Sequence, residues 1–275
     1  MSSTERILSE RKFRFSALER EQLEIDFSLS TDELLRRLVA EVRPHALVPV
    51  SGFQVGSAGV TSSGEVFLGV NLEFAGASFA QTVHSEQFLI CLRRTHSAAP
   101  LTKMAVSAPP CGHCRQFAVE FDRQGELELL IGDQETVRLK ELLPRAFTPE
   151  DLDISEPVYG SPLELSGDLS VEDAARRAAR SAYVPYSRNK AGVALRDAEG
   201  RLFAGSALEN AAYNPGLPPL QAALISAFAA GCELNKVVEV VLAQGTGELI
   251  DYEFQTGALA AKLHGGKVEF RTVVR

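Results

Sequence analysis

The sequence predicts an α/β fold made of two related three-layer α/β/α domains, each with a mixed sheet between helices. Two observations lead to this fold class. The first is that residues 46–75 are identical to the residues 136 positions later at twelve of thirty ungapped positions. Four of these matches are turn-forming residues, namely Pro49, Gly56, Gly64 and Gly69. Because turn residues meet specific backbone demands, this register indicates a duplication rather than a coincidence.

The second observation is that both halves show the same order of secondary-structure patterns. The first half begins with a capping-box pattern at Ser30–Glu33, which opens a helix with apolar residues at helical spacing that ends near Pro44. Two strands follow, at 53–60 and 65–72, around a turn at Ser63-Gly64. This arrangement predicts a hairpin packed against the first helix.

A second helix and a buried strand complete the pattern of each half. In the first half the helix covers 82–95, with Arg93-Arg94 as a solvated helix end, and the strand covers Met104–Ala108. The second half repeats the order with a helix from Ser170, strands at 191–196 and 201–208, a helix at 218–230 and a strand at Val237–Ala243. Short apolar strands of this kind are typical of a mixed sheet that helices cover.

These patterns divide the chain into four segments. We expect an N-terminal tail or extra helix at 1–29, a reactive domain at 30–150, a linker at 151–168 and a second domain at 169–275.

Composition and charge exclude several classes of protein. The chain is 45% hydrophobic and 23% charged, which is ordinary for a globular protein. No apolar run approaches the ~20 residues of a membrane helix, and the N-terminus is too charged for a secretory signal, so we expect a cytoplasmic protein without a membrane partner. The net charge of −8 repels a phosphate backbone, which disfavours a nucleic acid polymer and favours a small neutral partner.

The four cysteines are too few for a disulfide framework. Cys91 and Cys232 lie in apolar helical patterns and are expected to be buried thiols. Cys111 and Cys114 form a CxxC pair, which is available for metal or redox chemistry.

The reactive residues gather in the first half. His84-Ser-Glu86 stands at the predicted start of the 82–95 helix, and Pro110-Cys-Gly-His-Cys114 follows the next strand, with Cys111 27 positions after His84. One histidine and two cysteines leave the fourth position of tetrahedral zinc open, which is typical of a catalytic site. A helix start also favours the thiolate form of both cysteines. This H-x-E and P-C-x-x-C combination is the described signature of zinc nucleobase deaminases, with the glutamate beside the metal rather than on it.

The wider sequence resembles the cytidine deaminase family, in its two-domain homodimeric form, over roughly residues 30–275. The segments that carry the resemblance are Val48–Gly56, Gly69–Phe74, His84–Gln87, Pro110–Gln116, Ala146–Leu152 and Ala207–Pro215. The resemblance implies hydrolytic deamination of cytidine and 2′-deoxycytidine to uridine and 2′-deoxyuridine with release of ammonia, in pyrimidine salvage. It also implies a homodimer.

The resemblance assigns roles by matching positions. His84, Cys111 and Cys114 would bind one Zn²⁺ per chain, and Glu86 would be the catalytic acid and base. The implied substrate contacts are Phe53 beside the pyrimidine, Asn71 and Glu73 at the ribose hydroxyls, the Pro109 carbonyl at the amino group, and Phe147 as a cover, from its own or the neighbouring subunit. We expect His113 to orient the site rather than to bind zinc.

Structural roles remain open for three of these residues: Phe53 as core, Asn71 as a turn residue, and Glu73 as partly structural. The second half keeps Glu73 as Glu209 but has Leu220, Ala222, Gly247 and Ile250 where the first has His84, Glu86, Cys111 and Cys114, so it cannot hold zinc.

Three alternative functions remain. One is deamination of another small amine or of a nucleotide. A second is thiol-disulfide exchange by Cys-Gly-His-Cys, which would leave His84 and Glu86 unexplained. The third is a zinc protein acting on polynucleotides, which the negative charge disfavours.

Overall fold

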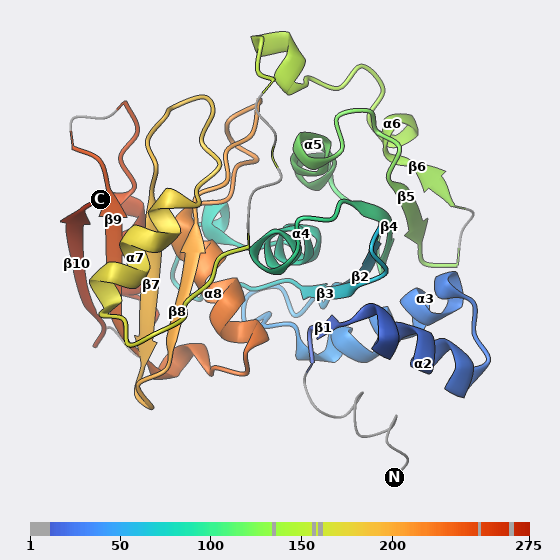
Figure 1. Ribbon diagram of the computed structural model, residues 1–275, viewed down its shortest axis with the longest axis horizontal. Helices are drawn as coiled ribbons and strands as arrows, with labels where there is room; N and C mark the ends of the chain where they lie inside the picture. The colour runs from blue at the N-terminus through green and yellow to red at the C-terminus, as the bar shows by residue number, and fades with distance from the viewer. Residues whose placement is uncertain (1–11, 134–135, 156–157, 159–161, 247–248, 264–266) are drawn as a thin grey trace.

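The computed structural model describes residues 12–133, 136–155, 158, 162–246, 249–263 and 267–275. The chain forms two sheets, each with helices packed on it, and the two units lie side by side (Figure 1). We call the elements up to residue 152 the first copy and those from residue 171 the second copy.

The first copy is a mixed sheet of six strands in the order β1-β3-β2-β4-β5-β6, in which only β4 and β5 pair in parallel. The strands are β1 (Arg14–Phe15), β2 (Gly56–Thr61), β3 (Val66–Val70), β4 (Leu101–Val106), β5 (Glu128–Ile131) and β6 (Val137–Arg138). The helices are α2 (Ala17–Phe27), α3 (Thr31–Val42), α4 (Ser85–His96), α5 (Gly112–Phe121) and α6 (Leu139–Leu142), with 3-10 turns at Arg43–His45, Phe79–Gln81 and Pro149–Leu152.

The second copy is a four-stranded sheet in the order β10-β9-β7-β8, with β10 parallel to β9. Its elements are α7 (Val171–Arg180), β7 (Gly192–Asp197), β8 (Leu202–Ser206), α8 (Pro219–Ala229), a 3-10 turn (Leu234–Lys236), β9 (Val237–Gln244), α9 (Glu253–Ala260) and β10 (Glu269–Val274). The predicted α/β fold with two related mixed sheets is confirmed.

The duplication extends to a backbone irregularity. In the first copy the pairing of β2 with β4 shifts register between Val60 and Thr61. In the second copy the pairing of β7 with β9 shifts between Arg196 and Asp197, which are 136 positions later. The register irregularity therefore falls at the same place in both copies.

The first copy has three layers because both faces of β2 and β3 are buried. Helix α3 covers one face with Leu34, Leu35 and Leu38, and the predicted capping box between Ser30 and Glu33 closes its start. Helix α4 covers the other face (Figure 1).

A glycine allows α4 to approach the sheet closely. A Cβ atom added to Gly69 on β3 would lie 2.2 Å from the backbone oxygen of Ser85, in the first turn of α4. The equivalent Gly205 on β8 would place a Cβ atom 2.1 Å from the backbone nitrogen of Ala223 in α8. Neither position has room for a side chain, and these glycines allow each helix to lie close to its sheet.

The N-terminal segment contains the extra helix that the sequence left as one option. Strand β1 pairs with β3, and α2 follows with a capping box between Ser16 and Glu19. Residues 1–11, where a tail was the other option, lie outside the described residues.

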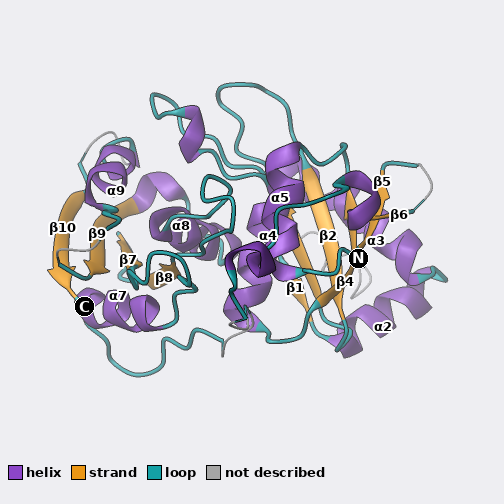
Figure 2. Ribbon diagram, turned by 90° about the horizontal axis from the view of Figure 1, so that it is seen from above, coloured by secondary structure: helices purple, strands orange, loops and turns teal. Residues whose placement is uncertain are grey.

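Helices α4 and α8 meet between the two sheets, as Figure 2 shows. The expectation of a solvated end at Arg93-Arg94 is wrong, since both side chains are buried at this junction. Arg94 donates from Nε to the Val158 carbonyl at 3.2 Å and from Nη2 to the Ser181 carbonyl at 3.0 Å. The guanidinium of Arg93 lies 5.7 Å from the centre of the Phe121 ring. Segments that are distant in sequence, around Val158 and Ser181, therefore cover the C-terminal end of α4.

A buried carboxylate also joins the two copies. Glu120, in the last turn of α5, is fully buried. Its Oε1 accepts the hydroxyl groups of Tyr183 at 2.6 Å and Tyr186 at 2.7 Å, and its Oε2 accepts the backbone N–H of Ala211 at 2.9 Å. All three donors come from the second copy.

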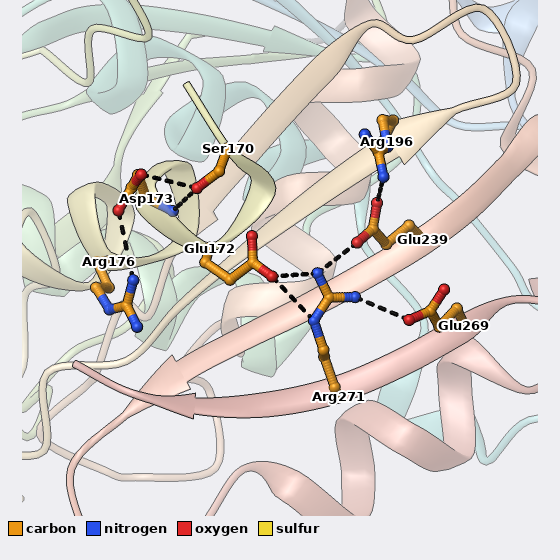
Figure 3. A network of polar contacts seen from close by, with 8 residues as sticks. All are labelled: Ser170, Glu172, Asp173, Arg176, Arg196, Glu239, Glu269 and Arg271. Carbon is orange, nitrogen blue, oxygen red and sulfur yellow. Dashed lines mark hydrogen bonds and ion pairs between the residues drawn. The ribbon is translucent and has the colours of Figure 1, made fainter. Parts of the chain in front are cut away.

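The edge of the second sheet is held by ion pairs around Arg271 on β10 (Figure 3). Arg271 pairs with Glu172 of α7, with Glu239 of β9 at 2.6 Å and with Glu269 at 3.1 Å, and Glu239 also pairs with Arg196 of β7. This network ties the edge strand to α7, which packs on the neighbouring strands of the sheet.

Within the described part of the chain, no helix has the length and apolar character needed to cross a membrane.

Candidate metal centre and active site

Three predicted ligands converge at the starts of two neighbouring helices. His84 directly precedes α4, and Cys111 directly precedes α5, which packs against α4 and carries Cys114 in its first turn. His84 Nδ1 lies 3.5 Å from Cys111 Sγ and 3.3 Å from Cys114 Sγ. The possible ligand atoms of the three residues all lie within 4.8 Å of one another.

These separations fit zinc. Tetrahedral Zn²⁺ takes nitrogen at ~2.1 Å and sulfur at ~2.3 Å, which places a nitrogen and a sulfur ligand about 3.6 Å apart. The measured separations are close to that value. Because the protein offers three such ligands here, a fourth position is left for water or substrate.

The thiols lie in an environment that favours one thiolate. Cys114 donates a hydrogen bond to Cys111, and this bond, together with backbone N–H groups at the start of α5, lowers the pKa of Cys111 to about 4. The same bond and burial raise the pKa of Cys114. A thiolate is the form that binds a metal.

Glu86 lies beside this cluster in the first turn of α4 and is only 4% exposed. Burial raises the pKa of its carboxyl group, and its side chain shares a hydrogen bond with Cys114. A raised pKa brings the carboxyl group closer to the range in which it can both accept and donate a proton, which is the property required of an acid and base catalyst.

Asn71 and Glu73 both hold the loop that carries Phe53. Asn71 Oδ1 accepts the N–H of Val55 at 2.9 Å, and its Nδ2 donates to the Phe53 carbonyl at 2.9 Å. Glu73 Oε2 accepts the N–H groups of Val50 and Ser51, both at 2.9 Å, and Oε1 accepts the Ser51 hydroxyl at 2.5 Å. Each residue therefore has a structural role in shaping the loop.

Three further predicted residues lie on loops at the surface of the single chain. Phe53 is 62% exposed, so the core alternative for this residue is wrong. Pro109 is exposed and directly precedes Pro110 and Cys111. Phe147 is 44% exposed. Its carbonyl accepts a hydrogen bond from Gln116 Nε2 at 2.6 Å, which holds this segment beside α5.

The sequence did not reveal that the second copy reaches this site. Gln87 Nε2 lies 3.1 Å from His113 Nε2 and 3.4 Å from the Pro215 carbonyl. The His113 ring stacks on the His84 ring with centres 5.7 Å apart. His113 thus contacts a predicted metal ligand, which is consistent with the expected orienting role.

A second link joins α5 to the same loop. Asn210 Nδ2 donates to the Gln116 carbonyl at 2.9 Å. Gln116 and Asn210 are 94 positions apart, and no local pattern in the sequence points to the pair.

Comparisons with known proteins agree with this geometry. The family model described as "Cytidine and deoxycytidylate deaminase zinc-binding region" matches residues 29–126, and a second model with the same description matches residues 139–256. A cytidine deaminase of Photobacterium profundum is 33% identical over 230 residues, which is 82% of this chain and 77% of that protein. A cytidine deaminase of Serratia proteamaculans is 37% identical over 240 residues, which is 86% of this chain and 81% of that protein.

Among solved structures, that of a cytidine deaminase from Mycobacterium tuberculosis matches with 32% sequence identity and a TM-score of 0.37. The match covers 42% of this chain and 94% of that one.

Proposed function

The chain belongs to the cytidine and deoxycytidylate deaminase family, and from this premise we propose that His84, Cys111 and Cys114 bind one Zn²⁺ and that Glu86 is the catalytic acid and base. The function is the hydrolytic deamination of cytidine to uridine and ammonia. The observation that carries the site assignment is the convergence of one nitrogen and two sulfur atoms at zinc-like separations, with a buried carboxyl group beside them.

The chemistry divides between the metal and Glu86. When bound, Zn²⁺ lowers the pKa of a coordinated water toward ~7 and so supplies a nucleophile at neutral pH for attack on C4 of the pyrimidine. Glu86 accepts the proton of that water and transfers it to N3. It then accepts the remaining proton of the same water and delivers it to the departing amine, which leaves as ammonia, so one carboxyl group acts first as base and then as acid. Its raised pKa suits both roles.

The loop residues bind and position the pyrimidine and the ribose of the substrate. Phe53 packs against the face of the base, Asn71 and Glu73 meet the ribose hydroxyls, and the Pro109 carbonyl accepts from the amino group. Phe147 covers the site from beside α5. The support for this assignment is that Phe53 is exposed for contact and that Asn71 and Glu73 hold its loop in place.

The substrates are the neutral nucleosides cytidine and 2′-deoxycytidine, in pyrimidine salvage. The Glu73 carboxylate and the chain's net charge of −8 both repel a 5′-phosphate, which disfavours nucleotides and polynucleotides.

The working unit is a homodimer in the cytoplasm. Phe53 and Phe147 are 62% and 44% exposed in the single chain, and a twofold partner would bury them and close the site. The cysteines are free, as in a reducing compartment. Light scattering on dilute enzyme tests the dimer, and a fully active monomer would contradict it.

The decisive experiment has two arms. Metal analysis of purified protein should give about one zinc per chain. Ammonia release should then be measured with cytidine, 2′-deoxycytidine, CMP and a cytosine-containing oligonucleotide, and we expect turnover of the two nucleosides alone. Zinc-free active enzyme, or turnover limited to CMP or the oligonucleotide, would overturn the proposal.

A further inference from the structure

A pocket of about 510 Å³ opens over the second copy, next to the place where the duplication would put a second reactive site. Glu209, Gln221, Tyr186 and Tyr213 of the second copy line one side of it, and Gln87 and His113 of the first copy line another. Pockets of this size accept small organic ligands.

Glu209 keeps the backbone cradle that Glu73 has in the first copy. Its Oε2 accepts the N–H groups of Tyr186 at 2.9 Å and Ser187 at 3.1 Å. These donors correspond, 136 positions later, to Val50 and Ser51, which bind Glu73 in the same way. The carboxylate is therefore held in an equivalent position in both copies.

The two carboxylates differ in their second oxygen. Both serine hydroxyls accept the equivalent backbone N–H, from Phe53 at 2.9 Å and from Asn189 at 3.0 Å. Ser51 also donates its hydroxyl to Oε1 of Glu73, whereas the described side chains of Ser187 and Glu209 form no such bond. Within the described part of the chain, no hydrogen bond reaches Oε1 of Glu209. This oxygen is thus available to accept hydroxyl groups of a ligand.

A buried amide provides a second, independent observation. Gln221 is only 4% exposed and lines the pocket, and its side chain makes no hydrogen bond to any residue that the structure describes. Its amide atoms are not sealed in the core but reach the pocket, so a ligand bound there can pair with them. An amide offers a donor and an acceptor side by side, which matches the adjacent N–H and carbonyl groups on the edge of a uracil ring.

Aromatic rings complete the pocket. Tyr186 and Tyr213 meet edge to face with ring centres 6.0 Å apart, and the Tyr213 side chain is 68% exposed. Such rings pack well against the face of a heterocycle.

We propose that this pocket is a second, non-catalytic nucleoside site, in which Glu209 accepts the sugar hydroxyls and Gln221 pairs with the edge of the base. The choice of ligand class rests on the proposed function, because it transfers to Glu209 the role given to Glu73. The ligand is bound without being converted, since the second copy has Leu220 and Ala222 at the positions of His84 and Glu86. The Glu209 carboxylate disfavours a phosphorylated ligand.

Uridine tests this proposal, because the enzyme does not convert it. Equilibrium dialysis of labelled uridine against zinc-loaded full-length enzyme should reveal two binding sites per chain. The Gln221→Leu variant, which keeps the side-chain size, should weaken one of the two by about tenfold or more. Glu73→Gln should instead weaken the other, and Tyr213→Ala, at an exposed position, provides a third variant that should fold.

A single uridine site per chain up to millimolar concentration would overturn the proposal, and so would two sites that respond neither to Gln221→Leu nor to Tyr213→Ala. Filling of the pocket by a partner subunit would appear as the first of these results. Ammonia release from cytidine tests the proposed function separately. A failure of the proposed function would therefore be recognised even if the Gln221-dependent site binds uridine.

Discussion

The buried Glu120 carboxylate should be one of the strongest links between the two copies, and Glu120→Gln tests it. The carboxylate accepts three hydrogen bonds at 2.6, 2.7 and 2.9 Å from Tyr183, Tyr186 and Ala211. A glutamine that keeps its oxygen on the tyrosine side turns its NH₂ group toward the N–H of Ala211. In the opposite orientation, both tyrosine hydroxyls lose their acceptor.

At least one buried donor is therefore left unpaired, at about 1–3 kcal/mol, and the remaining bonds lose their charge assistance. We expect the free energy of unfolding to fall by about 2–4 kcal/mol, measured by urea denaturation with circular dichroism. Glu126→Gln is the matched control, because Glu126 forms exposed ion pairs with Arg138 and Lys140. A loss for Glu120→Gln no larger than that of the control would refute the reasoning.

Four further outcomes are expected. Glu86→Gln should retain zinc but lower the rate of cytidine deamination about 10²- to 10⁴-fold, because the proton transfers lose their carrier; metal analysis and ammonia release check this, and near-normal turnover contradicts it. Cys114→Ser should reduce bound zinc well below one per chain after dialysis against a chelator, and full retention would exclude this ligand. Phe53→Ala should raise KM with little effect on the unfolding midpoint, since the ring is 62% exposed, whereas Phe79→Ala at an 83% exposed position should leave KM unchanged. Removal of residues 166–275 should abolish activity as well as stability, because it removes the loop that contacts α5; an active, folded remainder would show that the second copy is dispensable.

Local patterns were sufficient to predict most of the fold. The hairpins, the capped helices and the buried strands β4 and β9 follow from periodicity and turn residues. The sequence did not predict β1, β5, β6 and β10. Of these, β1, β6 and β10 lie at sheet edges, where pairing on one side only leaves a weaker pattern. The domain boundaries at residues 29, 150 and 168 stay predictions.

The group formed by His84, Cys111 and Cys114 could be predicted because zinc binding requires particular residue types at a recognisable spacing in the sequence. His84, Cys111 and Cys114 are marked by residue type, and they lie at the starts of two helices. The burial of a side chain by segments that are distant in sequence cannot be recognised from the residues around it. The partners of Arg94 are 64 and 87 positions away, so a basic pair near a helix end was wrongly expected to be solvated. Gln221 and Glu120 escaped notice for the same reason.

The close contact of Gly69 with α4 and of Gly205 with α8 gives the chain an internal control. The second copy has no counterparts of His84, Cys111 and Cys114, yet it keeps a glycine where α8 would collide with a side chain. Residues present in both copies are therefore those that the fold requires. Residues found in the first copy alone are those that the reaction requires. By that criterion Gly69 belongs to the architecture and His84 to the reaction. Glu73, which the second copy keeps as Glu209, belongs to the architecture, and the proposed ribose contact would add a second role. Exchanging segments between the copies would measure the two demands separately.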